Sequence, residues 1–86
     1  MAKIEIYTSQ FCGFCSAAKN LLGKKNAAFE ELDVMMHPKR KQEMVARAGG
    51  QTSVPQIFID DEHIGGCDDL YELEADGELD AKLASS

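Results

Sequence analysis

The chain has 86 residues, 44% of them hydrophobic, and a formal net charge of -6, which allow one modest hydrophobic core but not two. No apolar run approaches the roughly 18 to 20 residues of a membrane span, and a strand pattern begins where a signal peptide would lie. We therefore expect a single cytoplasmic domain over residues 1–86, without a membrane partner.

Charge and cysteine content narrow the function further. Residues 1–50 carry eight Lys and Arg against five Asp and Glu, whereas residues 51–86 carry one against ten. Because contacts with phosphates need a basic surface, this distribution argues against nucleic acid as a partner. The odd number of cysteines, three, fits a reducing compartment better than a disulfide framework.

The first half of the chain predicts two strands and two helices. Residues 3–8 alternate with a period of two, which is typical of a strand, and residues 13–24 have helical apolar spacing. Residues 29–34 read as a second strand. A strand, a helix and a strand at this spacing predict a right-handed crossover between parallel strands. A second helix is expected to begin at Pro38 and to stop at Gly49-Gly50.

The second half predicts a hairpin and further helix. The apolar run at residues 57–59 indicates a strand buried on both faces, and polar residues 60–62 turn the chain into a strand at residues 63–64. A third helix is expected over residues 67–76, followed by an amphipathic segment around 79–83. The predicted fold class is α/β: a four-stranded mixed sheet flanked by helices, with the first two strands parallel and the last two antiparallel.

The stretch Cys12-Gly13-Phe14-Cys15 places two thiols three positions apart, where a strand ends and a helix begins. Unpaired N–H groups and the positive end of the helix dipole favour a thiolate at Cys12. Cys15 lies one turn along on the same side, and we expect it to be more buried. The pair therefore predicts a reversible dithiol, with Cys12 as the nucleophile and Cys15 as the resolving thiol.

Two other uses of the cysteines are disfavoured. A permanent disulfide across so short a loop would constrain the unfolded chain little. A zinc site would draw on Cys12, Cys15, His63 and Cys67, but the last two lie on different predicted elements, without the close spacing of a zinc knuckle. We therefore expect no structural metal.

Three motifs carry a resemblance to a known family. The dithiol follows the first strand, Ser53-Val54-Pro55 precedes the third, and Gly65-Gly66-Cys67-Asp68-Asp69-Leu70 follows the fourth. In this order they resemble the dithiol glutaredoxins of the thioredoxin fold, and look especially like the small bacterial glutaredoxin 3 type. The resemblance covers nearly the whole chain. It implies a glutathione-dependent thiol-disulfide oxidoreductase that reduces protein disulfides and glutathione mixed disulfides in redox homeostasis.

The resemblance also implies a glutathione site. In the family the proline that matches Pro55 is cis, and the backbone of the residue before it, here Val54, is exposed to the substrate. The residues after the fourth strand match the site for the γ-glutamyl end, where a helix N-terminus suits the carboxylate and Asp68 suits the ammonium. The implied glutathione-binding residues are Phe14, Ser53, Val54, Pro55, Gly66, Cys67 and Asp68.

The sequence departs from the family pattern in three places. Gly13 and Phe14 replace the common Pro-Tyr pair. Ser9 stands near where glutaredoxins often carry a lysine for the glycine carboxylate of glutathione, and Gln51 stands where an arginine is frequent. The carboxylate must then meet cations of the second helix or neutral hydrogen bonds. The candidates are Lys39, Arg40, Lys41 and Gln51.

Two other functions remain open. Cys-Gly-Phe-Cys differs by one residue from the Cys-Gly-Phe-Ser of monothiol glutaredoxins, which hold a [2Fe-2S] cluster between two subunits; Cys12 would be the ligand here, and Gly13 lacks a ring that could obstruct such a dimer. The other is a small redoxin reduced by thioredoxin reductase. The resemblance itself implies a monomer whose partners are glutathione and disulfide-bearing or glutathionylated proteins, such as ribonucleotide reductase.

Overall fold

The structure is a computed structural model that describes residues 2–84. Every predicted helix and strand is present, with ends that coincide with the predicted ones or differ by at most two residues. None of the helices in the described range has the length and apolar character that a membrane span requires. The elements are β1 (Ile4–Thr8), α1 (Gly13–Lys24), β2 (Glu30–Asp33), α2 (Pro38–Arg47), β3 (Gln56–Ile59), β4 (Glu62–Gly65), α3 (Cys67–Ala75) and α4 (Leu79–Ala84).

The four strands form one mixed sheet in the order β2-β1-β3-β4. β1 pairs parallel with β2, so Thr8 lies opposite Asp33 and both strands end at the same edge of the sheet. β3 runs antiparallel to β1 and to β4. The predicted fold class is therefore confirmed, and the parallel pair follows from the α1 crossover, as expected.

The hairpin turn between β3 and β4 is tighter than the sequence predicted. Only Asp60 and Asp61 form it, and both have positive φ, 50° and 67°. Two-residue turns of this kind match the twist of the flanking antiparallel strands. The prediction that Glu62 belongs to the turn was wrong, because this residue already begins β4.

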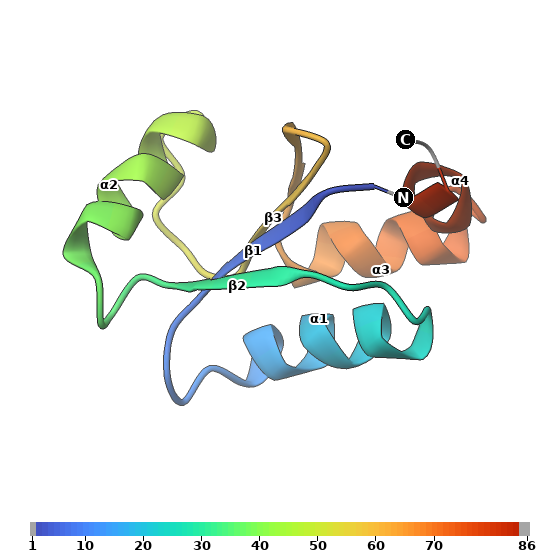
Figure 1. The fold of residues 1–86 in the computed structure, drawn as a ribbon, viewed down its shortest axis with the longest axis horizontal. Helices are drawn as coiled ribbons and strands as arrows, with labels where there is room; N and C mark the ends of the chain where they lie inside the picture. The colour runs from blue at the N-terminus through green and yellow to red at the C-terminus, as the bar shows by residue number, and fades with distance from the viewer. Residues whose placement is uncertain (1, 85–86) are drawn as a thin grey trace.

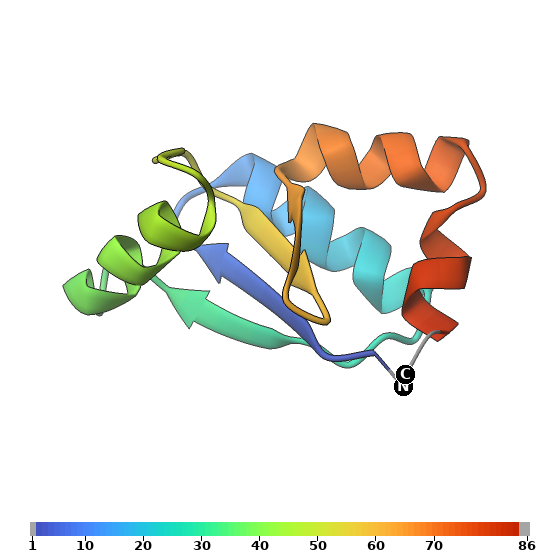
Figure 2. The same cartoon turned by 90° about the horizontal axis from the view of Figure 1, so that it is seen from above.

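Side chains that alternate along β1 build a core on each face of the sheet. Ile4 and Ile6 face α1 and α3, whereas Tyr7 faces α2. Figures 1 and 2 show α2 on one side of the sheet and α1, α3 and α4 on the other. The larger core contains Ile4, Ile6, Ala18, Leu21, Leu22, Ile57, Ile59, Cys67, Leu70 and Leu79.

α2 is held to the sheet largely through Arg47. Its guanidinium pairs with Glu5 (Nη2 to Oε1, 2.9 Å), donates to the hydroxyl of Tyr7 (2.8 Å) and lies 4.0 Å from the ring centroid of Phe58. The Tyr7 hydroxyl donates to Glu43, and this hydrogen bond lowers the pKa of that carboxyl. Among the residues of α2 itself, only Met44 is buried. Charge and π contacts therefore supply much of the attachment.

Leu22 gives a test of the larger core, since its side chain is wholly buried between α1 and the sheet. Leu22→Ala should lower the free energy of unfolding by about 2 to 5 kcal/mol, because it removes buried surface and leaves a cavity. Urea denaturation followed by circular dichroism measures this. The exposed Lys24→Ala should stay within about 0.5 kcal/mol. Equal effects of the two substitutions would contradict this assignment of the core.

Candidate active site

The N-terminus of α1 presents the two thiols. The chain leaves β1 through a short loop in which Phe11 has a φ of 59°, and Cys12 then takes an extended conformation as the N-cap of α1. Its Sγ accepts a hydrogen bond from the N–H of Cys15 at 3.2 Å. The sulfur thus fills the role that a Ser or Asp oxygen has at most helix N-termini. The prediction that Cys12 lies at the start of a helix is confirmed.

The two thiols differ in access and in protonation. Cys12 is partly exposed, whereas the Cys15 residue is only 2% exposed. Burial, followed by the hydrogen bond with Cys12, raises the pKa of Cys15 to about 12. Cys15 is therefore a neutral thiol at physiological pH. The predicted nucleophile, Cys12, needs an accessible sulfur, and the predicted resolving thiol, Cys15, should be sheltered and protonated until it reacts. The structure meets both requirements.

The loop before β3 lies against the dithiol. The Val54-Pro55 peptide bond is cis, which confirms the expectation drawn from the family resemblance. The carbonyl oxygen of Val54 lies 3.9 Å from Cys12 Sγ. A Cβ atom on Gly66 would lie 3.4 Å from the carbonyl oxygen of Pro55, at van der Waals contact, so the third motif lies against the second. The structure therefore brings the three sequence motifs together.

The N-terminus of α3 follows Gly66. Asp69 caps it by accepting the N–H of Gly66 at 2.9 Å. Asp68 is exposed, and no side chain within residues 2–84 is paired with it. Cys67 is buried, and burial, with a smaller contribution from Asp68, raises the pKa of its thiol. A protonated, buried Cys67 thiol agrees with the expectation that this residue contributes its backbone rather than its sulfur.

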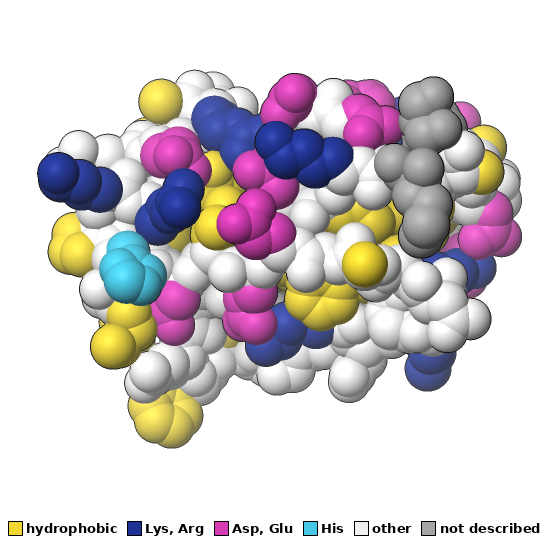
Figure 3. Space-filling view, viewed as in Figure 1, with side chains coloured by type: hydrophobic (Ala, Val, Ile, Leu, Met, Phe, Trp, Pro, Cys, Tyr) yellow, Lys and Arg dark blue, Asp and Glu magenta, His cyan; other side chains and the backbone are white. Residues whose placement is uncertain are grey.

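The predicted binding residues outside the three motifs are placed differently. Arg40 pairs with Glu43 on its own helix (Nη1 to Oε2, 3.2 Å). Lys39 and Lys41 are exposed on α2, where basic side chains lie among acidic ones (Figure 3). No contact joins these three cations to the dithiol within the described part of the chain. Gln51 lies beside Ser53 at the start of the loop, where both side chains accept hydrogen bonds from Gln56.

A hollow beside the dithiol contains residues that the sequence did not single out. Phe11 is 100% exposed at its rim. Glu31 accepts a hydrogen bond from the Thr8 hydroxyl at 2.7 Å and pairs with Lys19 at 3.0 Å, and these contacts lower the pKa of Glu31. Nothing in the sequence marked these residues except the position of Phe11 next to Cys12. The lining residues are Ser9, Gln10, Phe11, Cys12, Gly13, Cys15, Ser16, Lys19, Glu31 and Asp33.

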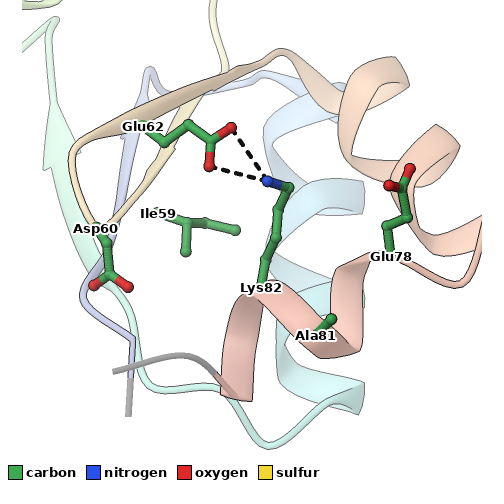
Figure 4. A pocket seen from close by; sticks show the side chains of 6 residues that line it. All are labelled: Ile59, Asp60, Glu62, Glu78, Ala81 and Lys82. Carbon is green, nitrogen blue, oxygen red and sulfur yellow. Dashed lines mark hydrogen bonds and ion pairs between the residues drawn. The ribbon is translucent and has the colours of Figure 1, made fainter.

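A second hollow lies at the β4–α4 side of the molecule. Figure 4 shows Lys82 reaching from α4 to the carboxylate of Glu62 on β4, an ion pair of 3.0 Å. This hollow holds none of the cysteines or the other predicted site residues. Its contacts attach the C-terminal helix to the hairpin.

The alternative of a zinc site would need His63 as a ligand, but the imidazole of this residue makes other contacts. His63 lies on β4, with its Nε2 2.6 Å from Oε1 of Gln56 and its ring stacked on Phe58. Within residues 2–84, no group of three or more His, Cys, Asp or Glu side chains is arranged to hold a metal ion.

Comparisons with known proteins agree on one family. The model of the glutaredoxin family matches residues 4–64. Glutaredoxin 3 of Escherichia coli is 52% identical over 83 residues, which are 96% of this chain and 99% of that protein. The solution structure of glutaredoxin from Brucella melitensis matches with a TM-score of 0.84 and 47% identity, over 96% of this chain and 89% of that one. The crystal structure of a buckwheat glutaredoxin-glutathione complex matches with a TM-score of 0.87 and 28% identity, covering 95% and 76%.

The burial of Cys15 predicts an ordered pattern of alkylation. At pH 7, iodoacetamide should modify Cys12 first, because Cys15 is sheltered and protonated. In a Cys12→Ser, Cys67→Ala variant, the rate at Cys15 should rise about tenfold per pH unit well beyond pH 9, because its thiolate fraction grows until the raised pKa is reached. Peptide mass spectrometry gives both rates. A Cys15 rate that levels off near the ~8.5 of a free thiol would contradict the assignment.

Proposed function

The chain belongs to the glutaredoxin family and is a thiol-disulfide oxidoreductase, and from this premise we propose that glutathione is its reductant. The observation that carries the proposal is the convergence of three groups. Cys12 Sγ lies 3.9 Å from the Val54 carbonyl, and the N-terminus of α3 lies against the same loop. A tripeptide thiol that pairs with Val54 would bring its sulfur to Cys12 and its γ-glutamyl end to Gly66 and Asp68.

With a glutathione mixed disulfide, one cysteine suffices. The Cys12 thiolate attacks the glutathione sulfur, a bond forms between these two sulfurs, and the substrate leaves as a thiolate that takes a proton from water. A second glutathione thiolate then attacks the glutathione sulfur on Cys12. Oxidised glutathione leaves, and Cys12 returns to the thiolate. Because Cys12 is partly exposed, both the mixed disulfide and the second glutathione can reach its sulfur.

With a protein disulfide, Cys15 completes the reaction. Cys12 attacks first and forms a mixed disulfide with the protein. Cys15 then loses its proton to water and attacks Cys12 Sγ, so that the protein leaves as a dithiol and a Cys12-Cys15 disulfide remains. Two glutathione molecules reduce this disulfide. The hydrogen bond from the Cys15 N–H already holds the Cys12 sulfur close to the resolving residue.

Different groups of the protein would bind the three residues of glutathione. The free N–H groups of the α3 N-terminus suit the γ-glutamyl carboxylate, and the unpaired Asp68 suits its ammonium. The Val54 backbone suits the central cysteine by adding a short strand. For the glycine carboxylate the chain offers Gln51 and the cations of α2. The buckwheat glutaredoxin, whose crystal structure is a glutathione complex, supports this choice of ligand.

A [2Fe-2S] cluster is the second candidate cofactor, favoured by the space at Gly13. A Cβ atom there would meet no other atom within 4 Å, so the surface beside Cys12 is open. Cys12 would be the protein ligand, because Cys15 and Cys67 are buried. Such a cluster supplies iron that binds thiolates, including those of glutathione. The competing use of Cys15 in disulfide formation places this function second.

Substitution of each cysteine separates the steps. Cys12→Ser should lower turnover by at least about a thousandfold with every substrate, because the nucleophile is lost. Cys15→Ser should retain turnover of a glutathione mixed disulfide and lose reduction of a protein disulfide. The measurement is NADPH consumption coupled through glutathione reductase, with the visible spectrum recorded on anaerobically purified protein.

Equal loss with both substrates in Cys15→Ser would contradict this division of roles. If the chain without substitutions shows only slow glutathione-dependent turnover, the visible spectrum distinguishes two explanations. A bound chromophore would favour the cluster, whereas a colourless, inactive preparation would point to thioredoxin reductase as the electron donor.

A further inference from the structure

A buried carboxamide joins β4 to the loop that carries the cis proline. Gln56 is 1% exposed, and its Nε2 lies 3.1 Å from Gln51 Oε1, 3.1 Å from the carbonyl oxygen of Ser53 and 3.3 Å from Ser53 Oγ. Its Oε1 lies 2.6 Å from Nε2 of His63. Every polar atom of this buried side chain is thus engaged, and the donor end is directed at the loop.

The carbonyl oxygen of Ser53 fixes which end of the Gln56 carboxamide faces the loop, because it can only accept a hydrogen bond. Because Gln56 Oε1 can only accept, the Nε2 of His63 must carry the hydrogen in this contact. The imidazole is itself held in place by stacking on Phe58, with ring centroids 5.0 Å apart, and the Phe58 ring also lies 4.0 Å from the guanidinium of Arg47. Turning the Gln56 amide over would set its oxygen against the carbonyl oxygen of Ser53, which leaves two acceptors facing each other.

The orientation of Gln56 sets that of Gln51. Gln51 uses its oxygen to accept from Gln56, so its Nε2 group, on the same amide carbon, remains available. Within residues 2–84 no group accepts a hydrogen bond from it, and the Gln51 side chain is exposed. The contact with Gln56 therefore leaves the two N–H donors of the exposed Gln51 amide without a partner among the described residues.

We propose that Gln56, held in place by His63, is a positioning residue for the glutathionyl group of the substrate. It holds residues 53 and 54 in place and turns the amide of Gln51 so that its N–H donors face a bound carboxylate. The inference rests on the proposed function, since it assigns the means by which that site receives glutathione without an arginine at position 51. Neither Gln56 nor His63 touches the reacting sulfurs in this assignment.

Kinetics of single variants test the assignment. Gln56→Met keeps the length of the side chain and removes both ends of the carboxamide. The KM for a glutathione mixed disulfide should rise roughly five- to tenfold, as expected for one or two lost hydrogen bonds, while kcat changes by less than about twofold. The alkylation rate of Cys12 should not change, because the N-terminus of α1 is untouched. His63→Val should act like Gln56→Met, and His63→Gln, which restores a donor, should recover part of the loss.

A double variant separates positioning from general damage. If Gln56 acts partly through Gln51, the rise in KM in Gln56→Met, Gln51→Met should be smaller than the product of the two single effects. Lys24→Ala, at the distant end of α1, serves as the matched control with unchanged KM. Urea denaturation checks that each variant is folded, and if Gln56→Met is not, His63→Val and Gln51→Met carry the test.

The outcomes separate this inference from the function on which it rests. An unchanged KM in folded Gln56→Met or His63→Val would overturn the inference while leaving the function intact. So would a parallel fall of kcat and of the Cys12 alkylation rate, which is the mark of a distorted dithiol. Absence of glutathione-dependent turnover in the unmodified chain would overturn the proposed function, and the inference with it.

Discussion

The first turn of α1 has backbone N–H groups that need an acceptor, and in this chain a sulfur atom meets that need. Cys12 Sγ accepts the N–H of Cys15 at 3.2 Å, so the group that caps the helix is also the group that reacts. One hydrogen bond thus fixes the distance between the nucleophile and the residue that resolves it. The parallel pairing of β1 with β2 across the α1 crossover determines where in the molecule this helix begins.

The rest of the site depends on close approach between segments that are distant in the sequence. The loop at Val54-Pro55 lies over Cys12, and α3 begins against that loop, where Gly66 lies beside the carbonyl oxygen of Pro55. Gly65 is more tightly constrained than Gly66, since its φ of 118° is rarely adopted by L side chains and a Cβ atom there would lie 2.2 Å from the Asp69 carboxylate that caps α3. The second and third motifs therefore pack directly against each other.

Sequence periodicity was sufficient for the elements, for the parallel and the antiparallel strand pairs and for the position of the dithiol, because each depends on local patterns. It failed where partners come from distant segments. The contacts of Cys12 with Val54, and of Arg47 with Glu5, have no signature within a short window. Phe11 was missed for another reason: a left-handed conformation is expected of Gly or Asn and not of an aromatic residue. The cis bond at Pro55 came from the family resemblance, since composition alone favours trans.

The attachment of α2 has a consequence for how the molecule opens. Within this helix only Met44 is buried, Val45 is partly buried, and the Arg47 network with Glu5, Tyr7 and Phe58 supplies the polar contacts with the sheet. Ionic contacts of this partly exposed kind weaken as salt is added, whereas the apolar packing of α1 and α3 does not. We therefore expect the local stability of α2 to fall more steeply with ionic strength than that of α1 or α3, and its amide hydrogens to exchange faster with solvent as salt is added.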